Sequence, residues 1–358
     1  LLKNTEFFLQ NTADKKIRVA TKSVRSLKLL NIIREHLGKK FVGLMAFDIR
    51  EAIWLVDNGF NDVLIGYPQF DETYINKIAE SENYKNKITL MVDSFDHFKC
   101  LEKFSGLKLC IDLDMSLEIP GLNFGVFRSS QKNMSDLKKL KMLIGNSKNN
   151  VVGMMGYEAQ LAGVPDEMGL LTFLIKFLKR LSKKRVEKYR RLALREFSEV
   201  KFFNGGGTGS VGFSPFDPSI NEVTIGSGFY CPTLFDLYEK LNLKPAIFFT
   251  LPVIRKPRSN VLTCLGGGYI SSGNIGKNKL PTPVYPKGLK FIPNEMAGEV
   301  QTPLRGGIVK NINIGDSVFF RPAKAGEVCE RFDTISLILR SGEIKTINTY
   351  RGDGKCFY

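Results

Sequence analysis

Short runs of β-branched and aliphatic residues recur through the first two thirds of the chain, separated by stretches long enough for helices. The runs that we expect to form strands cover residues 17–20, 41–45, 62–65, 88–92, 107–113, 151–154, 200–204 and 222–225. Residues 50–56 have helical apolar spacing and precede Asn58-Gly59, a pair typical of a helix end. Uniformly apolar strands that alternate with helices indicate parallel pairing. Eight such units predict an α/β fold, the (β/α)8 TIM barrel, with an open doubly wound sheet as the alternative.

The pattern changes after residue 240. Helical spacing nearly vanishes, nine prolines break the chain into short pieces, and glycine pairs such as Gly306-Gly307 supply turns. Alternating runs at residues 316–320 and 335–339 are typical of strands. We therefore predict a barrel domain over residues 1–240 and a second, mostly antiparallel β domain at the C-terminus, over residues 241–358.

The formal net charge of +16 could indicate nucleic acid or an anionic membrane surface as a partner. Much of the excess lies in residues 176–195, where the bases alternate with apolar residues at helical spacing. The apolar stripe consists of Phe177, Leu178, Leu181, Val186 and Tyr189. We expect a surface helix with a solvated basic face. No apolar run approaches the roughly 20 residues that cross a bilayer, and charge alone is not specific evidence for nucleic acid. We therefore expect neither a nucleic acid nor a membrane as partner.

The six cysteines are scattered, and no two have the C-x-x-C spacing. In a chain of 358 residues this distribution indicates reduced thiols and a cytoplasmic protein. The first residue is Leu1, and the opening has no signal-peptide pattern. We expect that the natural N-terminus lies upstream of it.

Residues 204–210, with the sequence NGGGTGS, directly follow a predicted strand. Gly207, Gly209 and Gly212 match the G-x-G-x-x-G spacing of dinucleotide-binding loops, which need the last glycine to open a helix. Pro215 and Pro218 follow instead, and no G-K-[ST] ends the loop, so the dinucleotide loop and the P-loop are both excluded. Loops after the seventh and eighth strands are the usual phosphate site of this barrel. The alternative is two tight turns without a ligand.

Lys22 ends the first predicted strand, at the rim where the glycine-rich loop also lies. The carboxyl ends of the strands form the catalytic face of such a barrel. An amine withdrawn from solvent there, near other cations, can form a Schiff base. A phosphate site and a Schiff-base lysine on one rim are the two attachment points of pyridoxal phosphate, so this cofactor is expected.

Several segments together resemble the fold-type III (alanine racemase-like) pyridoxal-phosphate enzymes, over nearly the whole chain. Within them the chain is most similar to the D-threonine aldolase and D-serine dehydratase branch, especially the bacterial amino acid deaminase/aldolase proteins. The segments are RVATKSVRS at Lys22, GVFRSS at Arg128, MMGYEAQLAG at Tyr157, NGGGTGS at Gly205 and GSGFYCPTLFDLY at Gly226. The resemblance is more specific for the family than for the reaction.

The resemblance implies roles for individual residues. Lys22 would carry the cofactor as a Schiff base, and Arg128 and Tyr157 would flank the cofactor ring or the substrate carboxylate as catalytic residues. A salt bridge between loops is the alternative for Arg128, and rim packing for Tyr157. The phosphate would be held by Gly206, Gly207, Thr208, Gly226, Ser227 and Gly228. Members of the family also form homodimers and begin with a segment upstream of Leu1 that completes the second domain.

The chain departs from the branch at its metal site, which there uses a histidine and a nearby cysteine or aspartate of the C-terminal domain. The two histidines, His36 and His97, are far upstream in helical stretches. Residues 322–329 offer only Glu327 and Cys329, and a transition metal needs three or four protein ligands. We expect no divalent metal, with Lys324 supplying the positive charge instead.

The function implied is a lyase that acts on a small-molecule substrate, a D-amino acid with a β-hydroxyl, by aldol cleavage or by dehydration and deamination. Lys22, once free, is the natural base. Racemisation stays open, because we do not expect the metal that assists the hydroxyl in this branch. A non-catalytic cofactor carrier or regulatory protein is a further alternative, although carriers of this fold are bare barrels. A basic nucleic-acid-binding protein would show salt-dependent binding.

Overall fold

Eight parallel strands close into a barrel in the computed structural model, which describes residues 1–166, 169–239, 241–273 and 276–357. The first strand pairs with the second and also with the last, so the predicted barrel is confirmed and an open doubly wound sheet is ruled out. The barrel strands are β1 (Lys16–Ala20), β2 (Phe41–Ala46), β3 (Val63–Ile65), β4 (Ile88–Val92), β5 (Lys108–Asp112), β8 (Asn150–Gly156), β9 (Phe202–Gly205) and β10 (Glu222–Ile225).

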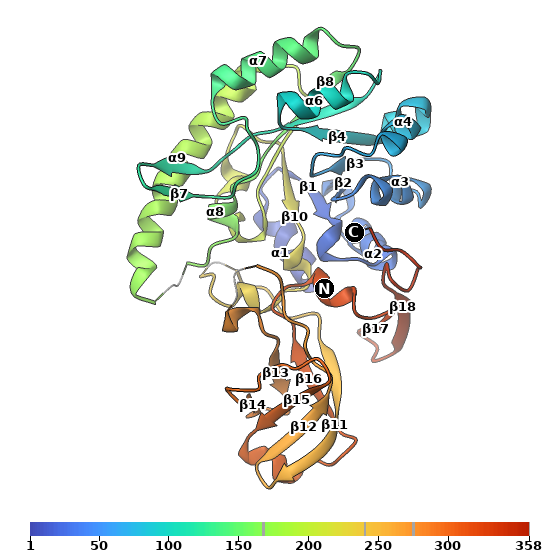
Figure 1. Cartoon of the computed structure of the whole chain (residues 1–358), viewed down its shortest axis with the longest axis vertical. Helices are drawn as coiled ribbons and strands as arrows, with labels where there is room; N and C mark the ends of the chain where they lie inside the picture. The colour runs from blue at the N-terminus through green and yellow to red at the C-terminus, as the bar shows by residue number, and fades with distance from the viewer. Residues whose placement is uncertain (167–168, 240, 274–275, 358) are drawn as a thin grey trace.

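Helices surround the barrel in the upper part of Figure 1. They are α1 (Leu2–Asn11), α2 (Leu27–Leu37), α3 (Ile49–Asp57), α4 (Glu72–Glu80), α5 (Glu82–Lys87), α6 (Phe95–Leu101), α7 (Met134–Gly145), α8 (Ala159–Ala162) and α9 (Thr172–Glu196). Local sequence sets their ends: the Asp48 carboxylate caps α3 by accepting from the N–H of Arg50, and Gly59 follows it with φ of 86°. His36 and His97 lie in α2 and α6, as predicted. No helix among the described residues has both the length and the apolarity to cross a membrane.

The basic stretch forms α9, as predicted, but its two faces differ from the expectation. Leu178, Val186 and Tyr189 are buried, whereas Phe177 is 50% exposed and does not belong to the packed stripe. Arg190 is fully buried because it pairs with Glu158 and Asp217 inside the protein. Most of the bases of α9 are exposed or partly exposed, as predicted, whereas Lys179 and Arg190 are buried.

An ion-pair network fills part of the barrel interior among the aliphatic side chains. Arg18 is fully buried on β1; its Nε lies 2.8 Å from Glu222 and its Nη1 lies 2.7 Å from Asp62. Glu222 also accepts from the Asn204 amide at 2.9 Å, and the Asn204 oxygen accepts from Thr224 at 3.0 Å. A chain of hydrogen bonds thus runs along the barrel interior from Arg18 to Thr224.

A six-stranded antiparallel sheet forms the lower part of Figure 1 and confirms the predicted second, mostly antiparallel architecture. Phe249 and Phe320 stack across it with ring centroids 5.2 Å apart. In spatial order the strands are β13 (Thr282–Tyr285), β16 (Ser317–Arg321), β11 (Phe249–Arg258), β12 (Val261–Leu265), β15 (Gln301–Arg305) and β14 (Lys290–Phe291). The boundary predicted at residues 240/241 stays a prediction, since Lys240 lies outside the described residues.

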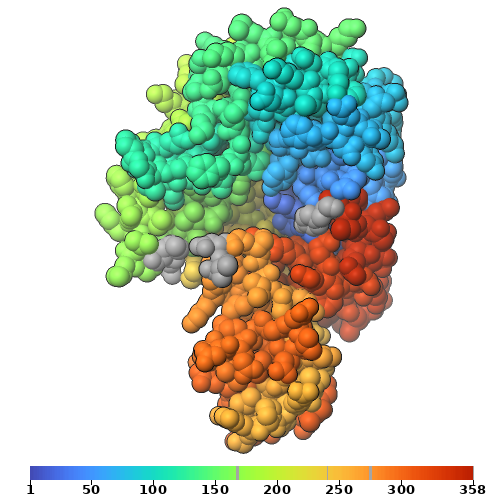
Figure 2. All heavy atoms as spheres, viewed as in Figure 1, coloured from blue at the N-terminus to red at the C-terminus, as the bar shows by residue number. Residues whose placement is uncertain are grey.

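The last segment of the chain returns to the barrel. It comprises α10 (Gly326–Cys329) and the hairpin of β17 (Thr334–Ile338) and β18 (Ile344–Asn348), coloured red in Figure 1 and Figure 2. The Ser26 hydroxyl donates to the carbonyl of Asn348 at 2.7 Å. The Tyr350 ring packs edge-on against Trp54 of α3, with centroids 4.9 Å apart. The C-terminal segment therefore supports the wall that carries Lys22.

Candidate functional site

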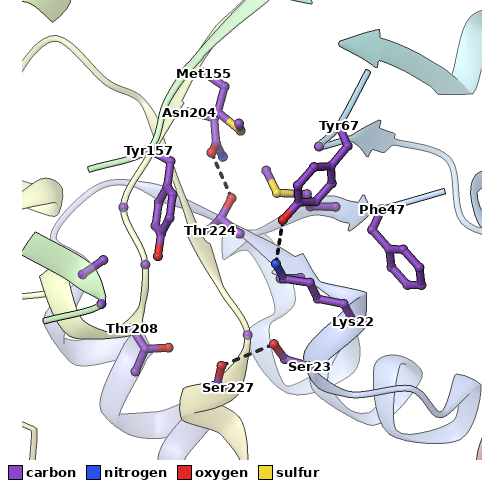
Figure 3. Close-up of a pocket in the computed structure, with 18 of the residues that line it drawn as sticks. Lys22, Ser23, Phe47, Tyr67, Met155, Tyr157, Asn204, Thr208, Thr224 and Ser227 are labelled. Atoms are coloured by element: carbon purple, nitrogen blue, oxygen red, sulfur yellow. Dashed lines mark hydrogen bonds between the residues drawn. The ribbon is translucent and has the colours of Figure 1, made fainter. Parts of the chain in front are cut away.

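A cavity of about 200 Å³ opens at the carboxyl ends of the barrel strands, where Lys22 enters it (Figure 3). Lys22 lies in the 3-10 turn η1 (Thr21–Ser23), directly after β1, as the sequence predicts. Residues from several strand ends line the cavity, because parallel strands deliver their following loops to one rim. Those that bear on its chemistry are Met45, Tyr67, Arg128, Tyr157, Gly206, Gly207, Thr208, Gly226 and Ser227.

The Lys22 amine points at a tyrosine that sequence analysis did not single out. Its Nζ donates a hydrogen bond to the Tyr67 hydroxyl at 2.9 Å, and it lies 5.3 Å from the centre of the Tyr67 ring. Lys22 is solvent-exposed, so the expected withdrawal of its amine from water was wrong. The reason is geometric: the open rim of the barrel leaves the side chain accessible from above.

Arg128 lines the same cavity and also forms an ion pair, while its catalytic role stays a prediction. Its Nε donates to the Asp112 carboxylate at 3.2 Å, and its Nη2 donates to the carbonyl of Gly66 at 3.1 Å. Its guanidinium also lies 5.1 Å from the ring of Tyr67 and 5.8 Å from that of Tyr157. Burial raises the pKa of Asp112 to about 6, while the Arg128 charge opposes this rise. Arg128 is both an ion-pair partner and part of the cavity wall.

Two tyrosines of the cavity have pKa values that are shifted in opposite directions. Tyr157 follows β8 directly, and burial, reinforced by Glu158, raises its pKa to about 12. Burial alone would also raise the pKa of Tyr67, but the charges of Lys22 and Arg128 outweigh this effect and lower it. In Figure 3 the two rings stand on opposite sides of the Lys22 amine. The cavity therefore holds one phenol that keeps its proton and one that releases it more readily.

The glycine-rich loop brings backbone close to the cavity, where side chains would not fit. Gly206 has φ of 81°, and a Cβ at Gly207 would lie 3.0 Å from that of Ala162. A Cβ at Gly226 would lie 2.8 Å from the Ser23 hydroxyl. Only short 3-10 turns follow the loop, η4 (Thr208–Ser210) and η5 (Ser214–Phe216), so the exclusion of a dinucleotide-binding helix is confirmed.

Three hydroxyls gather at this glycine-lined end of the cavity, in the lower part of Figure 3. The Ser23 and Ser227 oxygens lie 3.3 Å apart, and the Thr208 hydroxyl accepts from the N–H of Gly228 at 3.1 Å. Ser23 was missed because a serine beside the lysine has no distinctive spacing of its own. Gly228 does not line the cavity. Its hydrogen bond to Thr208 joins the two glycine-rich turns.

A buried carboxylate fixes the conformation of the first turn. Glu158 follows Tyr157 and is fully buried; it accepts from the N–H of Gly206 at 3.0 Å and from the Ser210 hydroxyl at 2.6 Å. It also accepts from Ser214 and from Arg190 of α9. Glu158 has no distinctive signal in the sequence, because its partners Arg190 and Gly206 lie more than 30 residues away along the chain.

Pyridoxal phosphate would need an amine within reach of its aldehyde, an anion cradle at the opposite end, and walls for its ring. Lys22 supplies the amine. The close-packed glycine backbone and the hydroxyls of Ser23, Thr208 and Ser227 supply a cradle that a Cβ would fill. Both glycine-rich turns lead into short 3-10 turns, which begin at Thr208 and Ser227. The residues present fit this cofactor.

The two candidate metal residues, Glu327 and Cys329, both lie in α10. Cys329 is buried, which raises the pKa of its thiol to about 12. Glu327 accepts from the Ser272 hydroxyl at 2.6 Å and from its N–H at 2.7 Å. Among the described residues no three histidine, cysteine or acidic side chains gather to hold a metal. This donor set does not fit a metal site.

Lys324 lies in a second cavity of about 490 Å³, between the β domain and the barrel. Its Nζ is 3.0 Å from the Ser272 hydroxyl and 3.4 Å from Glu327. It does not line the Lys22 cavity. The suggestion that its charge replaces a metal stays a prediction.

Comparison with known proteins finds neither a matching family model nor a matching curated sequence. Solved structures, in contrast, match over nearly the whole chain. The chain is similar to D-threonine aldolase from Filomicrobium marinum, with a TM-score of 0.79 and 16% identity over 99% of this chain and 93% of the other. For D-threo-3-hydroxyaspartate dehydratase from Delftia sp. HT23 the TM-score is 0.75 and the identity 13%, over 97% and 94%. For alanine racemase from Clostridium difficile 630 in complex with cycloserine they are 0.64 and 17%, over 98% and 96%.

These similarities show the fold. The chain has the alanine racemase-like architecture, a closed parallel barrel followed by a mostly antiparallel sheet, which the sequence resemblance predicts. The similar structures are an aldolase, a dehydratase and a racemase, so they do not single out one reaction.

Proposed function

We propose that the chain is a pyridoxal-phosphate-dependent lyase that acts on a D-amino acid with a β-hydroxyl and uses Lys22 as its Schiff-base lysine. One observation carries the proposal: the Lys22 amine and the glycine-lined hydroxyl cradle open into the same cavity. When bound there, the cofactor would supply an electron sink for a bond broken at Cα. The similarity to an aldolase and a dehydratase supports the lyase class.

The residues of the cavity would have different roles according to their positions. Thr208, Ser227 and the turns they begin would hold the phosphate, and Glu158 would keep the Gly206 turn in shape from behind. Lys22 would hold the cofactor through its amine, and the same amine would move a proton at Cα or at the β-hydroxyl of the substrate. Arg128 would hold a positive charge beside the substrate carboxylate while Asp112 fixes its orientation.

The experiment that tests this proposal is the visible absorption spectrum of the purified protein after addition of pyridoxal phosphate, before and after borohydride. We expect an absorption band that borohydride removes and a mass label that maps to Lys22. Lys22→Ala should lose the label, and Lys28→Ala, which changes an exposed lysine on α2, should keep it. No band in the wild-type protein would mean that the cradle serves another anion.

Substrate assays then separate the reactions. An aldolase would release glycine and an aldehyde from D-threonine, and a dehydratase would release a ketoacid and ammonia from D-serine. A racemase, the alternative that the similarity to alanine racemase keeps open, would interconvert enantiomers without cleavage. A carrier without turnover would bind the cofactor at Lys22 and consume none of these substrates.

We further propose that two copies of the chain associate as a homodimer. Large apolar side chains are exposed in η3 (Gly169–Leu171) and on the first turns of α9: Leu170, Leu171, Phe173, Leu174 and Phe177. Phe173, Leu174 and Phe177 share one helix face, and such a patch marks an interaction surface. Light scattering of the wild-type protein should give twice the mass of one chain. The double variant Phe173→Asp with Phe177→Asp should give the mass of a single chain. A wild-type protein with the mass of one chain would refute the dimer.

A further inference from the structure

An amine that attacks a carbonyl must first lose a proton, because the ammonium form has no lone pair. Many Schiff-base lysines lose it through burial, which disfavours the charged form. Lys22 is solvent-exposed, so its side chain is not enclosed by the protein. The structure instead places a phenol oxygen 2.9 Å from Nζ, as the direct hydrogen-bond partner of the amine.

We propose that Tyr67 is the proton-transfer partner of Lys22, its phenol oxygen exchanging a proton with Nζ along their hydrogen bond. The inference rests on the proposed function. Once the pair has released one proton to water, it exists as ammonium with phenolate or as amine with phenol. Moving the proton from Nζ to the phenolate oxygen leaves the net charge of the pair unchanged and frees the nitrogen lone pair. The reverse transfer returns the proton when Lys22 is displaced again.

The surroundings of Tyr67 favour its phenolate. Arg128 lies 5.1 Å from the centre of the Tyr67 ring on one side, and Lys22 lies 5.3 Å from it on another. The lowered pKa of Tyr67 reflects these two charges. The two positive charges therefore stabilise a negative charge on the Tyr67 oxygen.

The other groups that face Lys22 from the cavity walls are less suited to this exchange. Tyr157 keeps its proton, since its pKa is raised to about 12. Asp112 is turned toward Arg128, from which it accepts a hydrogen bond. Ser23 and Ser227 are aliphatic hydroxyls that bond each other and do not ionise in this range. Met45 and Phe47 carry no proton that exchanges.

The backbone around Tyr67 is held so that the hydroxyl meets the amine. Tyr67 follows β3 by one residue, and the preceding Gly66 accepts from Arg128 through its carbonyl. The Gln69 amide donates to the carbonyl of Tyr67 at 3.2 Å and accepts from the N–H of Ile49 at 3.0 Å. This short loop is tied both to Arg128 and to the start of α3.

The first test uses the chain without cofactor and follows phenolate absorbance in the ultraviolet as pH rises. We expect one tyrosine to ionise at lower pH than the others, and this step to vanish in Tyr67→Phe. In Lys22→Gln the same step should move to higher pH, because the ammonium that stabilises the phenolate is gone. Tyr157→Phe, which removes a phenol with a raised pKa from the same cavity, should leave the step in place. An identical titration in wild type and Lys22→Gln would overturn the pairing.

The second test measures how fast pyridoxal phosphate bonds to Lys22. Tyr67→Phe should slow bond formation at neutral pH by about 10²-fold, at the lower end of general acid–base effects. The rate should recover as pH rises, and the borohydride label should still reach Lys22 after long incubation. An unchanged rate and pH profile would overturn the proposal even if cofactor binds. If wild-type protein forms no bond with the cofactor, the proposed function fails, and the phenolate titration alone decides whether Tyr67 and Lys22 exchange a proton.

Discussion

Gly326 at the start of α10 packs directly against the carbonyl oxygen of Lys22, and a Cβ at position 326 would overlap that atom. The Arg25 side chain binds the same carbonyl from the barrel side, with its Nε 3.0 Å away. The backbone of the proposed Schiff-base lysine is therefore clamped between the barrel and the C-terminal segment. The position of the Lys22 amine depends on residues more than 300 positions away.

Gly326→Ala should disturb this clamp. The methyl group would meet rigid backbone atoms, and overpacking of this kind costs about 1–3 kcal/mol of the free energy of unfolding. We expect a lower urea midpoint together with slower cofactor capture by Lys22. Gly307→Ala is the matched control, because a methyl group there would have no other atom within 4 Å. Equal stability and equal capture rates in both variants would show that α10 does not constrain Lys22.

Glu158→Gln should destabilise the turn at Gly206, which we propose helps to bind the phosphate. Glutamine keeps the size of the side chain but can no longer accept from Gly206, Ser210, Ser214 and Arg190 at once. We expect weaker binding of inorganic phosphate, measured by calorimetry, and a loss of stability of about 3 kcal/mol, since Arg190 loses a buried ionic partner. Glu199→Gln changes an exposed carboxylate and should alter neither. Unchanged phosphate affinity would mean that the turn holds its shape without Glu158.

The barrel could be predicted from sequence because its strands are short apolar runs with helices between them, a pattern that local spacing records. Lys22 and the glycine-rich turns could be found because each follows such a run. Tyr67, Ser23 and Glu158 could not, since their importance lies in contacts that only the closed barrel creates. The same holds for Arg190, because the nearby bases Lys188 and Arg191 are exposed while its own partners are buried acids. The exposure of Lys22 depends on the shape of the rim, which spacing along the chain does not encode.

Arg18→Met should destabilise the barrel strongly. This substitution would leave the buried Glu222 without its cation. Asp62 would be affected less, because its side chain is 45% exposed and water can solvate its charge. Removing one member of a buried ion pair costs about 3–5 kcal/mol. Chemical unfolding should show this loss, and the double variant Arg18→Met with Glu222→Gln should recover part of it. A double variant no more stable than Arg18→Met would indicate that packing, not the buried charge, sets the cost.

Glu51 should make the stability of the chain depend on pH. It is fully buried beneath η1, where its carboxylate accepts from the N–H of Phe47 at 3.0 Å, and burial raises its pKa from 4.5 to about 7. Between these two values the folded chain holds the proton more tightly than the unfolded chain does. The contribution of Glu51 is therefore fully present below pH 4.5 and is lost as pH rises through about 7.

The loss amounts to on the order of 3 kcal/mol at higher pH. Glu51→Gln stays neutral at every pH, and its amide oxygen can still accept from Phe47. We expect its free energy of unfolding to exceed that of the wild-type chain at pH 8 and to approach it at pH 5. Taking the difference between the two proteins removes the effect of other groups that titrate in the same range, Asp112 among them. Glu35→Gln, an exposed carboxylate on α2, should show no such trend. A difference between Glu51→Gln and wild type that is the same at pH 5 and pH 8 would show that Glu51 is ionised in the folded chain throughout, and that the interior beneath η1 is wetter than its burial indicates.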